Sequence, residues 1–287
     1  HLSIRRQRQM CIRDRNGGVV AGDGGGIHNS GDLTLVNSTL SDNHTAARGG
    51  GIYNAGVLTL KSSTIGGKGT TVGERGNTAR DGGGIANASS GSVTLNNSTI
   101  SGNTATSDGG GIFNMGLLAL HNSTIVYNSA NNGGGVVNSD ASGTVNFRNT
   151  IIAGNADVAG GDYPDIYDTL ISQGYNLIGN LGIQSFTPST GDQVGTSGSP
   201  IDPGLGPLAD NGGDTWTHAL LPHSKAIDAG DPRGCFGSGG PLALDQRGQP
   251  RPTDGDFNGS FLCDIGAFEV GRKALVLLRA FPDPYDN

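Results

Sequence analysis

A repeated unit in the first half of the chain constrains the fold more than any other feature of the sequence. The tripeptide GGG begins at residues 24, 49, 82, 109 and 133, and each time an aliphatic residue follows it, with Asn two positions later. An alternating segment such as LTL or VTL comes next, and then STI, STL or NTI. The period is roughly 25 residues, apart from one longer interval that holds an insertion at 66–76, and such a period indicates a repeat architecture.

Each unit contains three short apolar segments separated by turns of Gly, Asn and Ser, which leaves no room for a helix of ordinary length. The 52 glycines of the chain and its many Asn, Ser and Thr residues also disfavour helices. Three short strands per unit, stacked unit upon unit, describe the coils of a parallel β-helix. We therefore predict an all-β fold, a single-stranded right-handed parallel β-helix or β-solenoid.

Strand alternation predicts which side chains fill this solenoid. In LTL and VTL the aliphatic residues point inward and the central Thr points outward. In the next segment the predicted core residues are Leu40, Ile65, Ile100, Ile125 and Ile151. An external row is expected from the preceding Thr39, Thr64, Thr99, Thr124 and Thr150, because Thr is a favourable exposed strand residue.

The asparagine that follows each glycine run is expected at a bend of the coil. Asn tolerates left-handed backbone geometry, and its amide can hydrogen-bond to the Asn of the next coil. The predicted ladder consists of Asn29, Asn54, Asn87, Asn114 and Asn138. The glycine runs themselves are interpreted as bends without side-chain bulk, since no Walker lysine or strand–loop–helix context of a phosphate-binding loop accompanies them.

Charge and hydropathy argue against two kinds of partner. The formal net charge is −7, and no basic stripe with interleaved aromatic residues is present, so we do not expect nucleic-acid binding. No apolar run approaches the roughly 18 residues of a membrane-spanning helix. We therefore expect no membrane span in this chain.

Composition changes along the chain and suggests its organisation. Residues 1–15, HLSIRRQRQMCIRDR, lack glycine and any trace of the repeat, so we expect this segment to be non-native or disordered. A true N-terminus with a signal peptide would then lie upstream. The repeats are assigned to residues 16–180, a second region to 181–270 and a tail to 271–287.

The repeat resembles that of known surface proteins. The pattern GGGIxN…LTLxNSTIxxNxA, over about residues 16–160, is similar to the repeats of bacterial right-handed β-helix surface proteins. It is also similar to the GGA[I/L/V] repeats of polymorphic outer-membrane proteins, although STIxxN replaces the aromatic FxxN half of that pattern. The resemblance implies a protein displayed outside the cell.

The second region resembles the conserved end of the bacterial family named choice-of-anchor Q. The matching sequence motifs are DPGLGPLADNGGDTWTHAL, AIDAG, DQRG, RP and CDIGAFE, in this order. We expect residues 181–270 to complete the solenoid and cap its end, because an open end exposes strand edges and core. The apolar residues available for this cap are Trp216, Leu220, Leu221, Ile227, Phe261, Ile265 and Phe268.

Cys235 and Cys263 lie within the choice-of-anchor Q-like region. For the exported protein that the resemblance implies, a disulfide that fastens the cap is expected. Two free buried thiols are the alternative. The six histidines are scattered without the spacing of metal ligands.

The segment TDGDFNG suggests a calcium site. Asp254, Asp256 and Asn258 stand at alternate positions before a glycine, which supplies hard oxygen ligands and a turn. Asp264 is a further candidate ligand, whereas Ile265 at the twelfth position excludes an EF-hand. The same residue types are also typical of ordinary turns without metal.

A carbohydrate-active enzyme of the pectate-lyase-like kind is the main alternative to a scaffold. The densest acidic group, with Tyr163 and Tyr167 nearby, consists of Asp157, Asp162, Asp165 and Asp168. Glycoside hydrolysis needs two carboxylates around the scissile bond, and a lyase needs a base. If the protein is an enzyme, these four residues are the catalytic candidates.

We favour a non-catalytic interpretation. Acidic and basic residues are sparse along the repeats, and fold analogy alone is a weak reason to expect activity. The sequence predicts a secreted or cell-surface, adhesin-like scaffold whose faces of Asn, Ser and Thr bind a glycan or a cell-surface ligand. No cofactor is expected with certainty, and Ca²⁺ is the one candidate.

Overall fold

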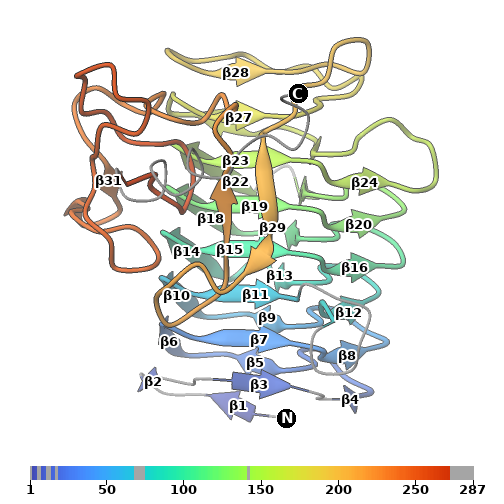
Figure 1. Cartoon of the computed structure of the whole chain (residues 1–287). Coiled ribbons are helices and arrows are strands. Elements are labelled where there is room, and N and C mark those ends of the chain that lie inside the picture. Colours follow the sequence, from blue (N-terminus) through green and yellow to red (C-terminus); the bar gives the residue numbers. More distant parts are fainter. Residues whose placement is uncertain are drawn as a thin grey trace, which may run out of the picture.

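The computed structural model describes residues 19–67, 75–140 and 143–271, together with three short strands at 2–4, 8–10 and 14–16. The chain forms a parallel β-solenoid of about six turns without helices in the described part, which confirms the predicted fold class. Figure 1 shows the coils stacked along one axis, from the N-terminal coils to strand β28 (Gln193–Val194). None of the described segments is a helix long and apolar enough to cross a bilayer.

Four parallel sheets run along the solenoid, one more than the three strands expected per coil. Sheet A contains β1 (Leu2–Ile4), β5 (Ile27–Asn29), β9 (Ile52–Asn54), β13 (Ile85–Asn87), β17 (Ile112–Asn114), β21 (Val136–Asn138) and β25 (Ile166–Tyr167). Sheet B contains β2 (Arg8–Met10), β6 (Asp32–Val36), β10 (Val57–Lys61), β14 (Ser92–Asn96), β18 (Leu117–His121), β22 (Thr144–Arg148) and β26 (Ile171–Ser172).

Sheet C contains β3 (Asp14–Asn16), β7 (Thr39–Ser41), β11 (Thr64–Gly66), β15 (Thr99–Ser101), β19 (Thr124–Val126), β23 (Ile151–Ala153), β27 (Leu177–Ile178) and β28. Sheet D contains β4 (Val19–Val20), β8 (His44–Thr45), β12 (Thr78–Ala79), β16 (Thr104–Ala105), β20 (Ser129–Ala130) and β24 (Ala156–Asp157). The strands of sheet D have two residues each, too few for an alternating pattern to be visible in the sequence.

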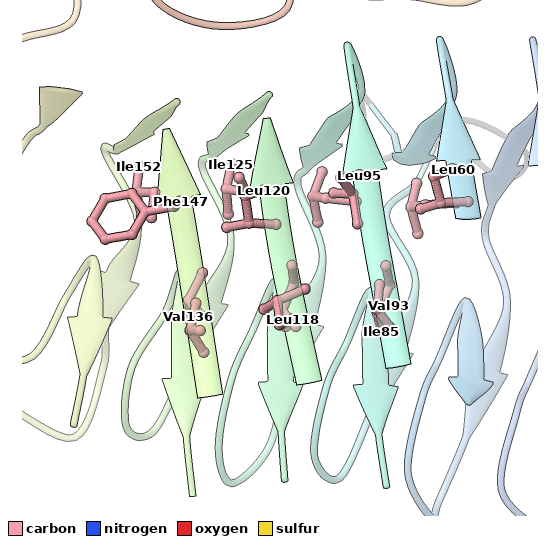
Figure 2. Packing of buried hydrophobic residues seen from close by; sticks show 14 of the residues in the cluster. Leu60, Ile85, Val93, Leu95, Leu118, Leu120, Ile125, Val136, Phe147 and Ile152 are labelled. Atoms are coloured by element: carbon pink, nitrogen blue, oxygen red, sulfur yellow. The ribbon is translucent and has the colours of Figure 1, made fainter. Parts of the chain in front are cut away.

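Similar apolar side chains stack in columns inside the solenoid (Figure 2). One column of sheet B runs through Leu35, Leu60, Leu95, Leu120 and Phe147, all of them fully buried. Each large aliphatic side chain that is removed from water contributes roughly 1.5–3 kcal/mol. The repeated coil therefore accumulates stability along the axis.

One predicted column is shifted by a residue in the last of the five repeats. The register pairs Ile125 with Ile152, and Thr124 with Ile151, so Ile152 is the core residue and Ile151 points outward. Thr150 correspondingly leaves the threonine row. The reason is the corner, because Asn149 takes the same left-handed conformation as Asn122, and the core position is counted from there.

The glycine runs continue the ladder from coil to coil instead of forming isolated bends. Gly83 N donates to Gly109 O, and Gly84 N to Gly110 O and to Gly111 O. A Cβ atom on Gly83 would lie 2.5 Å from Gly110 O, which is too close for any side chain. Glycine is thus required here by the close approach of neighbouring main chains.

Two columns of asparagine amides line the solenoid. Asn29, Asn54, Asn87, Asn114 and Asn138 form the first, and each Nδ2 donates to the Oδ1 of the next at 2.7–2.9 Å. The second runs through Asn43, Asn77, Asn103, Asn128 and Asn155 at 2.8–3.0 Å. The residues of these columns do not adopt the left-handed backbone conformation expected of the first column. A left-handed residue instead occupies the corner between sheets B and C in five successive coils, namely Asn37, Ser62, Asn97, Asn122 and Asn149.

The predicted region 181–270 occupies two different places. Phe186 and Val194 pack against the solenoid core, and the Phe186 ring lies 6.0 Å from that of Phe147 at the end of its column. Residues 202–270, here called the lateral segment, run back along the side of the stack (Figure 1). The antiparallel pair β29 (Leu205–Ala209) and β30 (Thr217–Leu220) belongs to this segment, as do β31 (Phe236–Gly237) and β32 (Gly240–Pro241).

Near the N-terminus, the described strands β1, β2 and β3 pair with the first repeat. They are parallel to β5, β6 and β7, although no repeat is visible in their sequence. Its non-native origin stays a prediction. Residues 68–74 of the insertion and 272–287 of the predicted tail lie outside the described part.

The second asparagine column supplies a stability prediction. Asn103 is fully buried, and its Oδ1 accepts from both the main-chain N and the Nδ2 of Asn77. Asn103→Ala leaves these donors unsatisfied, and we expect the free energy of unfolding to fall by about 2–4 kcal/mol, measured by chemical denaturation. Asn131→Ala, in which the lost amide is exposed, is the control, with an expected change within about 0.5 kcal/mol. Equal losses in the two variants would contradict the structural role of the column.

Candidate functional site

The outer face of sheet C is covered by the lateral segment, so its threonine row is not external. Thr64 and Thr99 are fully buried, and both bind the side chain of Gln246. The amide of Gln246 donates to Thr64 Oγ1 at 2.9 Å and accepts from Thr99 Oγ1 at 2.7 Å. The row that the sequence predicted to face solvent is thus an attachment surface.

His218 of β30 fastens the hairpin to the same sheet. Its Nδ1 lies 2.8 Å from Gly206 O and its Nε2 2.9 Å from Ser101 Oγ, so Nδ1 carries the proton in the neutral ring and Nε2 accepts from the hydroxyl. Burial lowers the pKa of His218 to about 4, with the hydrogen bond to Gly206 opposing this shift. The ring is therefore neutral at physiological pH.

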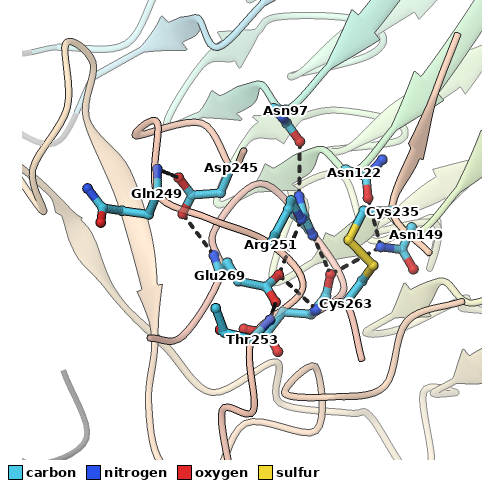
Figure 3. Close-up of polar contacts among 12 residues, drawn as sticks. Asn97, Asn122, Asn149, Cys235, Asp245, Gln249, Arg251, Thr253, Cys263 and Glu269 are labelled. Atoms are coloured by element: carbon cyan, nitrogen blue, oxygen red, sulfur yellow. Dashed lines mark hydrogen bonds and ion pairs between the residues drawn. A yellow bond between two sulfur atoms is a disulfide. The ribbon is translucent and has the colours of Figure 1, made fainter. Parts of the chain in front are cut away.

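A buried ion pair holds the end of the lateral segment (Figure 3). The side chains of Arg251 and Glu269 are fully buried, and Arg251 Nε lies 3.2 Å from Glu269 Oε2. Arg251 also donates to Asn97 Oδ1 of the corner at 2.9 Å and to Asp264 O at 2.7 Å. Burial raises the pKa of Glu269, and Arg251 opposes this shift.

A second buried carboxylate connects the DQRG motif to the CDIGAFE motif. Asp245 accepts from Glu269 N at 3.0 Å and from Arg247 Nε and Nη2 at 2.8 and 2.7 Å. The guanidinium of Arg247 stacks on the Phe268 ring at 3.5 Å from its centroid. The residues of these two sequence motifs therefore serve to fix the lateral segment in place.

Cys235 and Cys263 form a disulfide in the structure, with a Cα–Cα distance of 5.7 Å. It ties the loop around β31 to the CDIGAFE stretch (Figure 3). Next to it, Asn122 Nδ2 of the solenoid corner donates to Phe236 O at 2.8 Å. The covalent link thus lies at the contact between the lateral segment and the coils.

The apolar residues that were expected over the open end pack mostly against the side of the stack. Outward-facing residues of sheet C, Val126, Ile151, Ala153 and Leu177, form a cluster with Leu220, Ala226, Ile265, Phe268 and Val270. Ile227 packs against this cluster, whereas Phe261 is exposed. An aliphatic residue at an outward position, Ile151, was the sequence signal that this face is covered.

Sheet B presents a broad open face. Thr34, Thr59, Thr94, Ala119 and Asn146 lie in register along its centre and are half-buried. A parallel row contains the exposed Val57 and Leu117. Near the corner with sheet C there is a hollow of about 520 Å³, lined by Asn37, Ser62 and Asn97 of the corner and by polar and apolar residues of the lateral segment, among them residues 241–248.

The four candidate catalytic carboxylates do not converge. Asp157 accepts hydrogen bonds from the main-chain N atoms of the loop that follows it, and Asp162 accepts from Ser197 Oγ at 2.7 and 2.8 Å. Asp168 accepts from the amide of the next residue. Among the described residues, the group of three acidic side chains within ligand distance of one another contains none of the four. The rings of Tyr163 and Tyr167 do meet, with centroids 4.6 Å apart.

Asp165 ends the second asparagine column. Its Oδ1 accepts from Asn155 N and Nδ2 at 3.0 and 2.9 Å, and its Oδ2 accepts from Asn180 N at 2.5 Å. The side chain is fully buried, so no substrate reaches it. Burial raises the pKa of Asp165 to about 7, and the hydrogen bonds from Asn155 and Asn180 oppose this shift.

Two of the four predicted calcium ligands meet a residue that the sequence analysis missed. Carboxylate oxygens of Asp254 and Asp256 lie within 4.8 Å of one another and of a carboxylate oxygen of Asp228. Asp228 belongs to the AIDAG motif. Asp264 is turned elsewhere, because its two oxygens accept from Asp228 N and Val270 N. Asn258 donates to Asp256 Oδ2 at 2.8 Å. Burial, together with the charge of Asp256, raises the pKa of Asp228.

Comparison with known proteins gives one short match. A family model described as the Chlamydia polymorphic membrane protein repeat matches residues 97–115. These residues run from the left-handed corner at Asn97 through β15, β16 and β17, which are three of the four strands of a coil. Neither the curated proteins nor the solved structures gave a match.

The buried ion pair of the lateral segment yields a second prediction. Arg251→Ala leaves the Glu269 carboxylate buried without its guanidinium, so we expect a loss of about 3–5 kcal/mol in the free energy of unfolding. Arg233→Ala is the control on the same segment; its side chain is 69% exposed, and the expected loss is below about 1 kcal/mol. The double variant Arg251→Met/Glu269→Met should recover much of the loss, and failure to do so would show that the charge pairing is not the cause.

The pKa of Asp165 predicts a pH dependence of stability. The unfolded chain ionises this residue near pH 4, whereas the folded chain keeps its proton up to about pH 7, so the native state binds more protons in this interval. The contribution of Asp165 is therefore fully present below about pH 4 and is lost as pH rises through about 7, by an amount on the order of 4 kcal/mol.

The measurement compares the wild type with Asp165→Asn from pH 4 to pH 8. The variant has no group that ionises, and its amide places an N–H opposite Asn180 N, a penalty that does not depend on pH. The difference in unfolding free energy, wild type minus variant, should fall as pH rises. A flat difference would mean that Asp165 titrates like a solvated carboxylate.

Proposed function

We propose that this protein is a secreted or surface-displayed scaffold whose open sheet B face binds a glycan or another cell-surface ligand without cleaving it. The observation that carries the proposal is that face itself. It extends over at least five coils in register, whereas sheet C is buried under the lateral segment. A long, rigid and uncharged row of small side chains suits an extended polymer with a repeating surface.

The chemistry of this face is suited to sugars. Hydroxyl and amide groups of Thr34, Thr59, Thr94 and Asn146 supply hydrogen-bond partners, and Val57 and Leu117 supply apolar contacts beside them. Ligand sites generally combine apolar surface with a few placed polar groups. The hollow at the B–C corner adds a recess at the edge of the same face.

Export is supported by three independent features. The chain carries a disulfide, which persists in oxidising compartments. Residues 97–115 match the repeat of a polymorphic membrane protein family. The sequence motifs of the lateral segment resemble those of the choice-of-anchor Q family, whose members are secreted or surface-displayed. We therefore propose an extracytoplasmic location and an adhesin-like role.

The enzyme alternative has less support. Asp165, one of its four candidates, is fully buried, and Asp157 and Asp162 are engaged by main-chain and hydroxyl donors. The half-buried Tyr163–Tyr167 pair and the exposed Asp168 remain the place where cleavage of a polysaccharide would have to be sought.

The test is a glycan and polysaccharide panel in which bound ligand and newly formed chain ends are recorded together. Thr59→Glu and Thr94→Glu place charge on the open face of sheet B, and we expect each to reduce binding at least tenfold. Thr104→Glu, an identical change on the exposed face of sheet D, is the matched control and should bind like the wild type.

Three results would count against the proposal. Equal loss of binding in the sheet B and sheet D variants would mean that the face is not the site. New reducing or unsaturated ends would favour the enzyme alternative, and their loss in Asp168→Asn would place the chemistry near the tyrosine pair. Absence of any retained glycan would overturn the glycan-binding role.

A further inference from the structure

We propose that Asp228, Asp254 and Asp256 bind a calcium ion, which fastens the loop of residues 253–260 onto the turn that contains Asp228. This site goes beyond the proposed scaffold role and does not depend on it. It also differs from the ligand set expected from sequence, because Asp228 takes the place of Asp264.

The three carboxylates come together from two parts of the lateral segment. Each offers an oxygen atom, and these atoms lie within 4.8 Å of one another. Asp228 and Asp254 are buried, at 9% and 3% exposure, whereas Asp256 is exposed at the mouth. Three carboxylate groups at this separation repel one another unless a cation lies between them.

Asp228 supplies an independent sign of a missing partner. Its Oδ2 accepts hydrogen bonds from Gly255 N and Asp256 N, both at 2.9 Å, so the carboxylate is turned toward the loop. Its other oxygen, Oδ1, is buried and accepts no hydrogen bond. A buried carboxylate oxygen without a donor is costly, and a bound cation satisfies it.

The remaining candidates of the sequence analysis have other roles. Asp264 accepts from Asp228 N at 2.7 Å and thereby positions the main chain that carries the ligand residue. Asn258 uses its Oδ1 to accept from Ser260 N at 2.7 Å and its Nδ2 to hold Asp256. We therefore treat both as positioning residues around the site and not as ligands.

The donor set selects calcium among common cations. Three carboxylates offer hard oxygen atoms, which suit Ca²⁺ and Mg²⁺ but not the nitrogen and sulfur preference of zinc. Mg²⁺ demands near-ideal octahedral geometry and releases its water reluctantly, whereas Ca²⁺ accepts six to eight ligands in irregular arrangements. A site with one exposed carboxylate leaves positions for water and matches the flexible geometry of calcium.

The experiment uses the full chain after treatment with a chelator, titrated with CaCl₂ alone or MgCl₂ alone by calorimetry. We expect one calcium ion per chain with a dissociation constant of roughly 10⁻⁵ to 10⁻³ M, and at least tenfold weaker magnesium binding. Asp228→Asn preserves the shape of the side chain and should weaken calcium binding at least tenfold. Asp210→Asn, an exposed aspartate of the same segment, is the matched control and should bind calcium like the wild type.

A second readout separates loss of the site from loss of the fold. Without calcium, Asp228→Asn should unfold at the same denaturant concentration as the wild type or at a higher one, since a repelling charge is removed. Calcium should slow proteolytic cleavage within residues 253–260 of the wild type and leave the cleavage rate of the variant unchanged. No calorimetric signal in the wild type, tighter binding of magnesium, or equal binding by the Asp228→Asn and Asp210→Asn variants would overturn the proposal.

Discussion

The hydrogen bonding of one coil to the next, in strict register, is the constraint on which the rest of this structure depends. Inside the stack, each buried amide of the two asparagine columns except the last finds its partner in the identical residue of the next coil. A buried polar group without a partner is costly, so a coil that departed from the repeat would destabilise both neighbours. This explains why the sequence repeats its polar residues as faithfully as its aliphatic ones.

The lateral segment uses a different kind of interaction. It carries a fully buried ion pair, Arg251 with Glu269, and a mostly buried one, Arg247 with Asp245, and it meets the coils through side chains of the corner and of sheet C. Buried ion pairs contribute little net stability but impose a specific geometry. The pairs therefore serve to fix where the segment lies, while the apolar cluster around Ile151 and Phe268 supplies the stabilising burial.

Much of the solenoid could be predicted from the sequence, because its determinants are local and repeated. The alternation of apolar residues and the asparagine positions are visible within each coil, and the period is visible from one coil to the next. The fourth sheet was missed because its strands have two residues, and Ile151 was misplaced because the NTII stretch allows two alignments that only the left-handed corner at Asn149 separates. The sites could be predicted only in part. Asp228 meets Asp254 through long-range packing, and the burial of Asp165 follows from its place at the end of a column, which no local pattern reveals.

The position of the lateral segment has a mechanical consequence. Stacked repeats normally interact only with their neighbours, so their ends can unravel one coil at a time. Here a single stretch of chain contacts three separate coils. Its Asp214 binds Asn37, its His218 binds Ser101 and its Asp264 binds Asn149, so the segment bridges coils that never touch one another. A pulling force along the axis would load these contacts together in shear. The solenoid is thereby joined into one cooperative rod, which resists extension along its axis as a unit and not coil by coil.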